Sequence, residues 1–287
     1  MNLDLIRKDF PILETQVNGH QIVYFDNGAT TQRPLPVVNA VVDYVTHQNG
    51  NPHRGAHIFA ISASEAYDTS KEVVRDFIHA RSEKEIIYTR NTTESLNLVS
   101  RSYGETHLKK GDHILITIAE HHSNLVTWQR AAEKTGAVLD YIYIDKETGH
   151  FPEEELKKID DPRVKILAFA QVSNVLGVEF DPKPLIKRAH AHGAVVVLDG
   201  AQSTPHKQID VQDLDCDFFA FSGHKMCSMG GIGVLYAKEE LLDEMEPFLM
   251  GGDMIETVEE QTTTFAELPA KFEAGTQLSL IHISEPT

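Results

Sequence analysis

Two charged side chains that follow apolar strands are the strongest chemical signal in the sequence. Asp199 ends the run VVVLD, and Lys225 follows the run FFAF after the short loop SGHK. A carboxylate beside buried surface needs a cationic or hydrogen-bonding partner, because burying an unpaired charge is costly. A lysine near buried surface can have the pKa of its amine lowered and can then attack carbonyl groups. Taken alone, Asp199 is more often a turn cap and Lys225 a surface lysine.

Taken together, Asp199 and Lys225 fit a site for pyridoxal 5'-phosphate (PLP). In such sites a lysine forms a Schiff base with the cofactor and an acid partners the pyridine nitrogen, which makes the ring an electron sink. Thr93 starts a predicted helix, whose free N–H groups favour a phosphate. Ser222 and His224 can add donors from the lysine loop. Simple N-capping by Thr92 or Thr93 is the plain alternative, and it is compatible with phosphate binding.

The motif EHHSN adds His121, which follows another predicted strand. An imidazole can stack on a pyridine ring and can move protons near neutral pH. The chain has 15 histidines, and most of them must be ordinary surface or core residues. Position alone therefore does not assign a role to His121.

The elements that must position these residues alternate from about residue 85 onward. We predict strands at 85–89, 113–117, 138–144, 164–170, 194–199, 217–221 and 233–237. We predict helices at 92–103, 123–135 and 153–159, one from Pro182 and one from Lys238. Strands that are apolar on both faces and separated by helices indicate an α/β fold, a mostly parallel sheet between helix layers.

Ligands in such sheets bind beyond the carboxyl ends of the strands, where the candidate residues fall. Thr92 and Thr93 follow the first predicted strand, and Ser173 and Asn174 follow the strand at 164–170. Asp199 and the lysine loop end the next two strands in the chain. The sequence therefore predicts one shared site at this edge.

Composition narrows the class of protein. The 287 residues carry 26 Lys and Arg against 43 Asp and Glu, a formal charge of −17, which disfavours binding to nucleic acid or anionic lipid. Two cysteines, Cys216 and Cys227, are too few for a disulfide framework or a structural zinc site, and no metal site is predicted. The N-terminus lacks the apolar core of a signal peptide, and no apolar run approaches the ~18 residues of a membrane span. We expect a soluble, cytoplasmic protein that does not enter a membrane.

Eight motifs, in order and in register, carry a family resemblance: FDNGATTQ, HRGAH, RNTTESLNLV, EHHSN, QVSNVLG, LDGAQ, FSGHK and FEAGT. The set resembles fold-type I PLP enzymes of the class V aminotransferase group, and within that group the SUF-type (group II) cysteine desulfurases. The likeness runs from Leu3 to Thr276. That family converts L-cysteine to L-alanine and passes the sulfur, as a persulfide on a catalytic cysteine, to a scaffold or carrier protein for iron–sulfur cluster assembly.

The resemblance implies a role for each matching position. Lys225 would bond to PLP and move protons at the substrate carbon, Asp199 would pair with the pyridine nitrogen, and His121 would stack on the ring. Gln202 and Asn174 would lie near the ring hydroxyl and the substrate. The phosphate would be held by Thr93, Ser222 and His224, and Thr276 would reach the phosphate of the neighbouring subunit in a homodimer.

The chain also departs from the family pattern. The family's catalytic cysteine and its carboxylate-binding arginine lie in a small C-terminal domain, which we expect to be missing here, leaving a truncated large domain. Cys216 matches a buried strand-edge position, and Cys227 is not the nucleophile position. HKMCSMGGIG replaces the usual Gly-Pro-Thr-Gly stretch, so the backbone beside Lys225 can differ. We expect an N-terminal helical segment at 1–20, the PLP-binding domain at 21–276 and a non-native tail at 277–287.

The sequence leaves two other functional interpretations open. The chain could be another class V enzyme, such as a selenocysteine lyase, an aminotransferase or an isopenicillin-epimerase-like protein. It could instead be a non-catalytic fragment that binds PLP weakly, because it lacks a thiolate placed to attack the substrate sulfur. Such a fragment would expose apolar surface and tend to aggregate.

Overall fold

A seven-stranded sheet organises the computed structural model, which describes residues 2–277. Its strand order is β3-β9-β8-β7-β6-β4-β5. The strands are β3 (Ile86–Thr89), β4 (His113–Thr117), β5 (Val138–Ile142), β6 (Val164–Ala170), β7 (Val195–Asp199), β8 (Phe218–Ser222) and β9 (Gly233–Ala237). Only β9 runs against its neighbours, so the other six strands end at the same edge. The predicted, mostly parallel sheet is confirmed.

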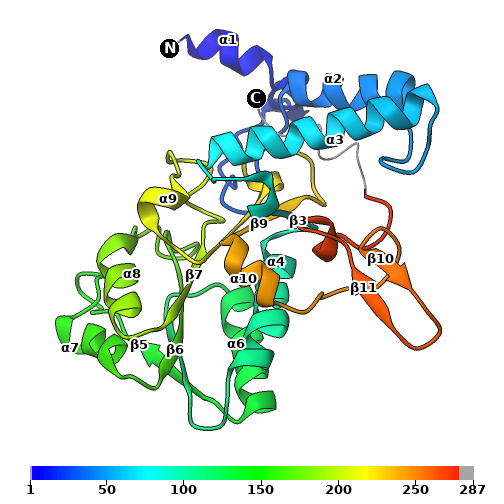
Figure 1. Cartoon of the computed structure of the whole chain (residues 1–287). Helices are drawn as coiled ribbons and strands as arrows, with labels where there is room; N and C mark the ends of the chain where they lie inside the picture. The colour runs from blue at the N-terminus through cyan, green and yellow to red at the C-terminus, as the bar shows by residue number, and fades with distance from the viewer. Residues whose placement is uncertain (1, 278–287) are drawn as a thin grey trace.

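Helices cover both faces of this sheet. They are α1 (Leu3–Lys8), α2 (Leu35–Asp43), α3 (Ile58–Phe77), α4 (Thr92–Leu98), α5 (Glu105–His107), α6 (His122–Thr135), α7 (Glu153–Leu156), α8 (Pro182–Ala191), α9 (Val211–Leu214) and α10 (Glu239–Glu244). In Figure 1, α4, α6 and α10 lie on one side of the strands and α8 and α9 on the other. The predicted pair of helix layers is therefore present.

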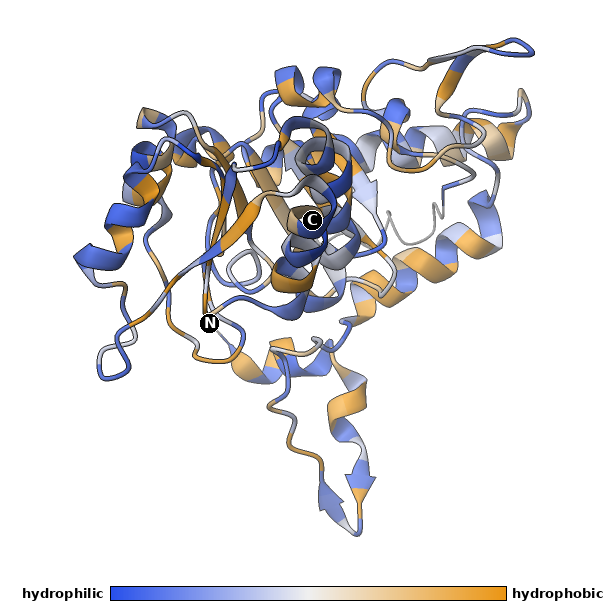
Figure 2. Cartoon of the chain, turned by 90° about the horizontal axis from the view of Figure 1, so that it is seen from below, coloured by the Kyte–Doolittle hydropathy of each residue, from blue (hydrophilic) through white to orange (hydrophobic). Residues whose placement is uncertain are grey.

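The side-chain alternation of the strands divides the core into two layers. In β8, Phe219 and Phe221 pack into the layer that contains α8, while Phe218 packs with Trp128 of α6 in the other layer. Successive strand residues point to opposite faces, so a strand that is buried on both sides must be apolar throughout. Figure 2 shows this pattern: apolar residues run along the strands, and the surrounding helices alternate between polar and apolar positions.

Several segments outside the predicted pattern have regular structure. They are the long helix α3, the helix α2, and two hairpins, β1–β2 (Gln16–Val17, His20–Gln21) and β10–β11 (Ile255–Val258, Thr263–Phe265). The predicted helix at 92–103 is α4 followed by a π-helical turn, Val99–Gly104. In the first twenty residues, α1 and a 3-10 turn at Pro11–Glu14 precede β1. The division of the chain into domains stays a prediction, and the predicted tail lies outside the described residues except for Gln277.

Across residues 2–277, no helix has the length and apolar character needed to cross a membrane. Over the same range, the structure contains no cluster of three or more side chains that could hold a metal ion.

Candidate functional site

A cavity of about 600 Å³ lies where the parallel strands end. Its lining includes every predicted site residue except Thr276, namely Thr93, His121, Asn174, Asp199, Gln202, Ser222, His224 and Lys225. These side chains come from the ends of β3, β4, β6, β7 and β8. The prediction of one shared site at this edge agrees with the geometry.

Asp199 is the buried charge of the cavity. Its Oδ1 accepts a hydrogen bond from the Ala201 N–H at 2.9 Å, and within residues 2–277 its Oδ2 has no hydrogen-bond partner. Burial raises the pKa of the Asp199 carboxyl, and the nearby Lys225 and His121 partly oppose that shift. Because Asp199 is a buried residue whose free carboxylate oxygen has only the cavity beside it, a cationic or donor group is expected there.

Lys225 supplies the amine. It ends the 3-10 turn Gly223–Lys225, directly after β8, and its Nζ forms no hydrogen bond or ion pair with any described residue. Burial lowers the pKa of the Lys225 amine, and attraction to Asp199 opposes that shift. A lowered pKa increases the fraction of neutral amine near neutral pH, which is the form that attacks a carbonyl.

The start of α4 forms the end of the cavity that suits an anion. Asn91 is the N-cap, accepting from the Glu94 N–H at 2.9 Å, so neither Thr92 nor Thr93 has the capping role considered from the sequence. The Thr92 N–H donates to Ser222 Oγ at 2.8 Å, and the two hydroxyls are 2.6 Å apart. Thr93 lies in the first turn, where N–H groups have no partner within the helix. Thr92 and Ser222 thus join α4 to β8 beside these donors.

His121 is the N-cap of α6. Its Nδ1 accepts from the Ser123 N–H at 3.1 Å and lies 2.7 Å from Ser123 Oγ. A backbone N–H can only donate, so Nδ1 carries no proton and the neutral ring holds its proton on Nε2. Burial lowers the pKa of His121, which favours this neutral form.

Glu120 is a buried carboxyl beside the site that sequence reasoning missed; it does not line the cavity, but the charge of Asp199 adds to burial in raising its pKa. Its carboxyl accepts from Asn124 Nδ2 at 2.6 Å and from the Ala170 N–H at 3.1 Å, and it bonds to the Thr117 hydroxyl. Burial raises the pKa of Glu120 to about 8. Its position directly before His121 was the available signal, but nothing in the sequence indicates that the Glu120 side chain is buried while His121 lines the cavity.

A second missed part is the loop that holds Phe25, Asp26, Gly28 and Ala29, which line the cavity. Gln202 Nε2 donates to the Gly28 carbonyl at 2.8 Å, which fastens this loop across the cavity. The motif FDNGATTQ was the signal, but its distance of more than 170 residues from Gln202 hid the contact.

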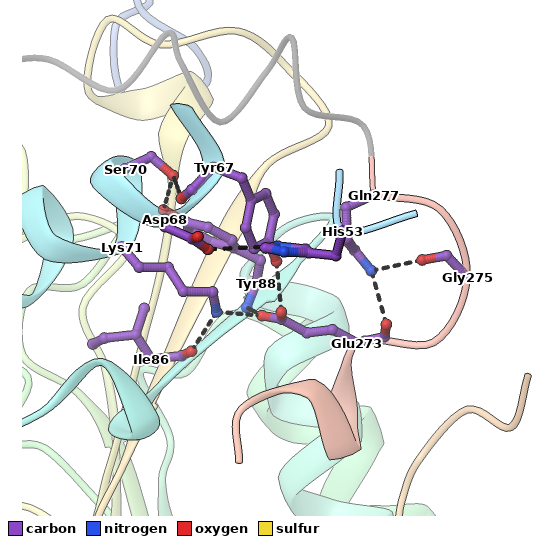
Figure 3. Close-up of polar contacts among 10 residues, drawn as sticks. All are labelled: His53, Tyr67, Asp68, Ser70, Lys71, Ile86, Tyr88, Glu273, Gly275 and Gln277. Atoms are coloured by element: carbon purple, nitrogen blue, oxygen red, sulfur yellow. Dashed lines mark hydrogen bonds and ion pairs between the residues drawn. The ribbon is translucent and has the colours of Figure 1, made fainter. Parts of the chain in front are cut away.

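Thr276 lies apart from the Lys225 cavity of its own chain. It lines a different cavity, together with Arg90, Glu94 and Phe248. The same FEAGT motif is anchored at Glu273, which accepts from Lys71 Nζ at 2.6 Å, the Tyr88 N–H at 2.7 Å and the Tyr67 hydroxyl at 2.5 Å (Figure 3). The role expected for Thr276, toward a neighbouring subunit, stays a prediction.

The cavity fits PLP by the chemistry of its groups. It combines a buried carboxylate with an unpartnered oxygen, a lysine without a partner among the described residues, a histidine, and donors at a helix start. These are the groups needed for the pyridine nitrogen, the aldehyde, the ring face and the phosphate.

Comparison with known proteins places the chain in a family. Residues 23–282 match the model of the family described as "Aminotransferase class-V". A protein named "Probable cysteine desulfurase" from Halalkalibacterium halodurans is 49% identical over 278 residues, 97% of this chain and 68% of its own length. The cysteine desulfurase CsdA of Escherichia coli superposes with a TM-score of 0.89 at 39% identity, covering 99% of this chain and 70% of that one.

A cysteine desulfurase from Thermococcus onnurineus gives a TM-score of 0.91 at 41% identity, over 98% of this chain and 68% of its own. The matched relatives are longer than this chain, which spans only 43–65% of the length of seven others. The sheet order, the cavity at its edge and these matches agree with one another. The chain belongs to the class-V aminotransferase family and has the fold of fold-type I PLP enzymes.

Proposed function

We propose that this chain binds PLP through Lys225 and Asp199 and provides the cofactor site of a cysteine desulfurase. The observation that carries the proposal is an unpaired amine and an unpaired carboxylate oxygen lining one cavity. Elsewhere in the described chain, the buried Lys71 and Glu273 are paired with each other. The names of the relatives favour cysteine desulfurase over the other class V activities.

Each residue has a task that follows from its chemistry. Asp199 holds a proton on the pyridine nitrogen, and His121 packs on the ring face with its own proton on Nε2. Lys225, as a neutral amine, takes a proton from the Cα of the substrate. Thr93, Ser222 and His224 hold the phosphate, with Thr92 fixing the Ser222 hydroxyl. Bound PLP supplies the electron-withdrawing ring that makes the Cα proton acidic.

The substrate we propose is L-cysteine, whose C–S bond breaks as its sulfur passes to a thiolate and L-alanine remains. Gln202 and Asn174 lie in the cavity wall, where they can contact this amino acid. The proposal includes a homodimer, with Thr276 reaching the neighbouring phosphate, and transfer of sulfur to a carrier or scaffold protein for iron–sulfur cluster assembly in the cytoplasm.

Neither cysteine of the chain lines the cavity, and this favours a second candidate function. Cys216 is fully buried, and burial raises the pKa of its thiol. Cys227 lies in a separate cavity beside Leu3 and Phe10. A thiol with a raised pKa is a poor nucleophile. We therefore propose that this polypeptide by itself binds PLP but releases little sulfide from cysteine, and that the sulfur-accepting thiol belongs to a segment beyond this sequence or to another chain.

The test is a titration of the purified chain with PLP, followed by visible absorbance. We expect an absorbance band of lysine-bound cofactor, which Lys225→Ala abolishes and the surface variant Lys187→Ala leaves unchanged. An unchanged band in Lys225→Ala would refute the cofactor proposal. Alanine and sulfide assays with L-cysteine test the second candidate, since robust turnover by the unaided chain would contradict it.

A further inference from the structure

Thr31 touches both ends of the loop that carries Lys225. Its hydroxyl is 3.0 Å from the His224 carbonyl oxygen and 2.7 Å from the Cys227 backbone nitrogen. A carbonyl only accepts and an N–H only donates, so the hydroxyl donates to the first and accepts from the second. One side chain thus joins the residue before Lys225 to the residue two positions after it.

The His224 carbonyl receives further donors from the same segment. The Thr31 N–H donates to it at 2.9 Å and the Thr30 hydroxyl at 3.0 Å. Neither threonine lines the Lys225 cavity; Thr31 acts on it through the loop backbone, whereas Thr30 Oγ1 also lies 3.2 Å from Nδ1 of His224, which lines the cavity. Because the Lys225 amine has no hydrogen-bond partner among residues 2–277, that backbone sets where the amine lies.

The loop needs such an anchor. Cys227 has φ = +67°, the left-handed region, which costs a residue with a Cβ on the order of 1–2 kcal/mol. The N–H groups of Met226 and Ser228 bond within the loop, to the Gly223 carbonyl at 2.9 and 3.1 Å. The Cys227 N–H instead bonds to Thr31, so this contact holds the strained residue in place.

We infer that Thr31 is a positioning residue, which fixes the Lys225 loop and so holds the amine beside Asp199 in the cofactor site. The inference deepens the proposed function and rests on it where the cofactor is concerned. The anchoring of the loop itself does not depend on the cofactor, which allows the two claims to be tested separately.

The first experiment uses the cofactor-free chain. Thr31→Val keeps the side-chain shape but removes the hydroxyl, and Thr31→Ser keeps the hydroxyl. The control is Thr106→Val, which removes a hydroxyl that bonds only within its own helical segment and to its neighbour His107. Hydrogen exchange of the peptide covering 223–228 should be roughly tenfold faster in Thr31→Val, as expected for the loss of about two net hydrogen bonds. Thr31→Ser and Thr106→Val should exchange like the parent chain, and circular dichroism verifies folding.

The second readout is the pH profile of Lys225 labelling by an amine-reactive reagent, followed by mass spectrometry. If Thr31 positions the amine, its titration midpoint rises toward that of an ordinary lysine in Thr31→Val and returns in Thr31→Ser. A purely structural role would leave the midpoint unchanged while the chain became less stable. If Thr31→Val does not fold, Thr30→Val, which removes one donor to the His224 carbonyl and the contact to the His224 ring, should give a weaker version of the change in hydrogen exchange.

The third readout is the PLP dissociation constant, which should rise roughly tenfold in Thr31→Val and recover in Thr31→Ser. Unchanged exchange or an unchanged labelling midpoint in Thr31→Val would overturn the inference. If the parent chain binds no PLP, the proposed function fails, while the first two readouts still decide whether Thr31 positions Lys225.

Discussion

Two regions of the molecule place a lysine near a buried carboxylate, and they differ in how the charges are satisfied. Lys71 Nζ bonds to Glu273 at 2.6 Å and to the Ile86 carbonyl at 2.8 Å, and it lies 4.6 Å from the centre of the Tyr88 ring. Lys225 has no such partner in the described chain, and Asp199 has one backbone donor. The first pair is complete without a ligand, whereas the second requires one. Satisfied buried charges therefore indicate structure, and unsatisfied ones indicate a binding site.

The largest expected effect comes from breaking the satisfied pair. Glu273→Ala leaves the Lys71 ammonium buried and unpaired, which should destabilise the chain by about 3–5 kcal/mol. The double variant Lys71→Met with Glu273→Leu removes both charges and should recover part of that loss, because the Tyr88 N–H and the Tyr67 hydroxyl still lose Glu273 as their acceptor. Urea unfolding followed by circular dichroism measures both. A Glu273→Ala chain as stable as the parent would contradict the role of this pair.

A second effect concerns pH and the carboxyl of Glu120. Its folded-state pKa of about 8 lies above the ordinary value of 4.5, so the folded state binds this proton more tightly than the unfolded state. The resulting stability is complete below pH 4.5 and is lost as the pH rises toward 8. Glu120→Gln cannot titrate, so its unfolding free energy should fall less over that range. If the unfolding free energies of the parent chain and Glu120→Gln changed in parallel with pH, the raised pKa would be ruled out.

Relieving the strain at Cys227 should change stability by a smaller amount. Cys227→Gly removes the Cβ from a left-handed residue, which should stabilise the folded loop by about 1 kcal/mol. The gain should be larger in the Thr31→Val background, because the hydrogen bond that holds the strained residue is absent there. Thermal melting of the parent chain, the two single variants and the double variant measures whether the two substitutions affect stability independently. Strictly additive effects would argue against a shared anchor.

The smallest effect on stability is expected at Lys225. Removing its amine as Lys225→Met deletes a charge that no described group satisfies, so the stability of the cofactor-free chain should stay within about 0.5 kcal/mol or rise slightly. A loss of several kcal/mol, comparable with that of Glu273→Ala, would mean that Lys225 has a structural partner and would remove the contrast between the two regions.

The strands and their shared edge could be predicted because burial on both faces leaves an apolar run that ends sharply, as at Asp199. The helix α3 was not predicted, since exposed Ile58, Phe59 and Ile61 blur its apolar stripe. The hairpin β10–β11 is mostly exposed, so its polar residues lack a burial-dependent alternation.

Within the site, residue types indicated Asp199 and Lys225, while the environments of Glu120 and Thr31 depend on distant parts of the chain. Glu120 accepts from Ala170, 50 residues away, and Thr31 bonds to His224, 193 residues away. A single sequence without an aligned relative contains no local pattern that reports such contacts. Only the folded geometry can supply them.

The central claim is that the unpaired Lys225 is the residue that bonds to PLP. Incubation of the chain with PLP, reduction with borohydride and mass spectrometry of the digested protein test it directly, because reduction makes the lysine–cofactor bond permanent. We predict that the pyridoxyl group is found on the peptide containing Lys225 and that Asp199→Ala weakens this labelling. Labelling of another lysine, such as Lys71, or an even spread over surface lysines, would contradict the account.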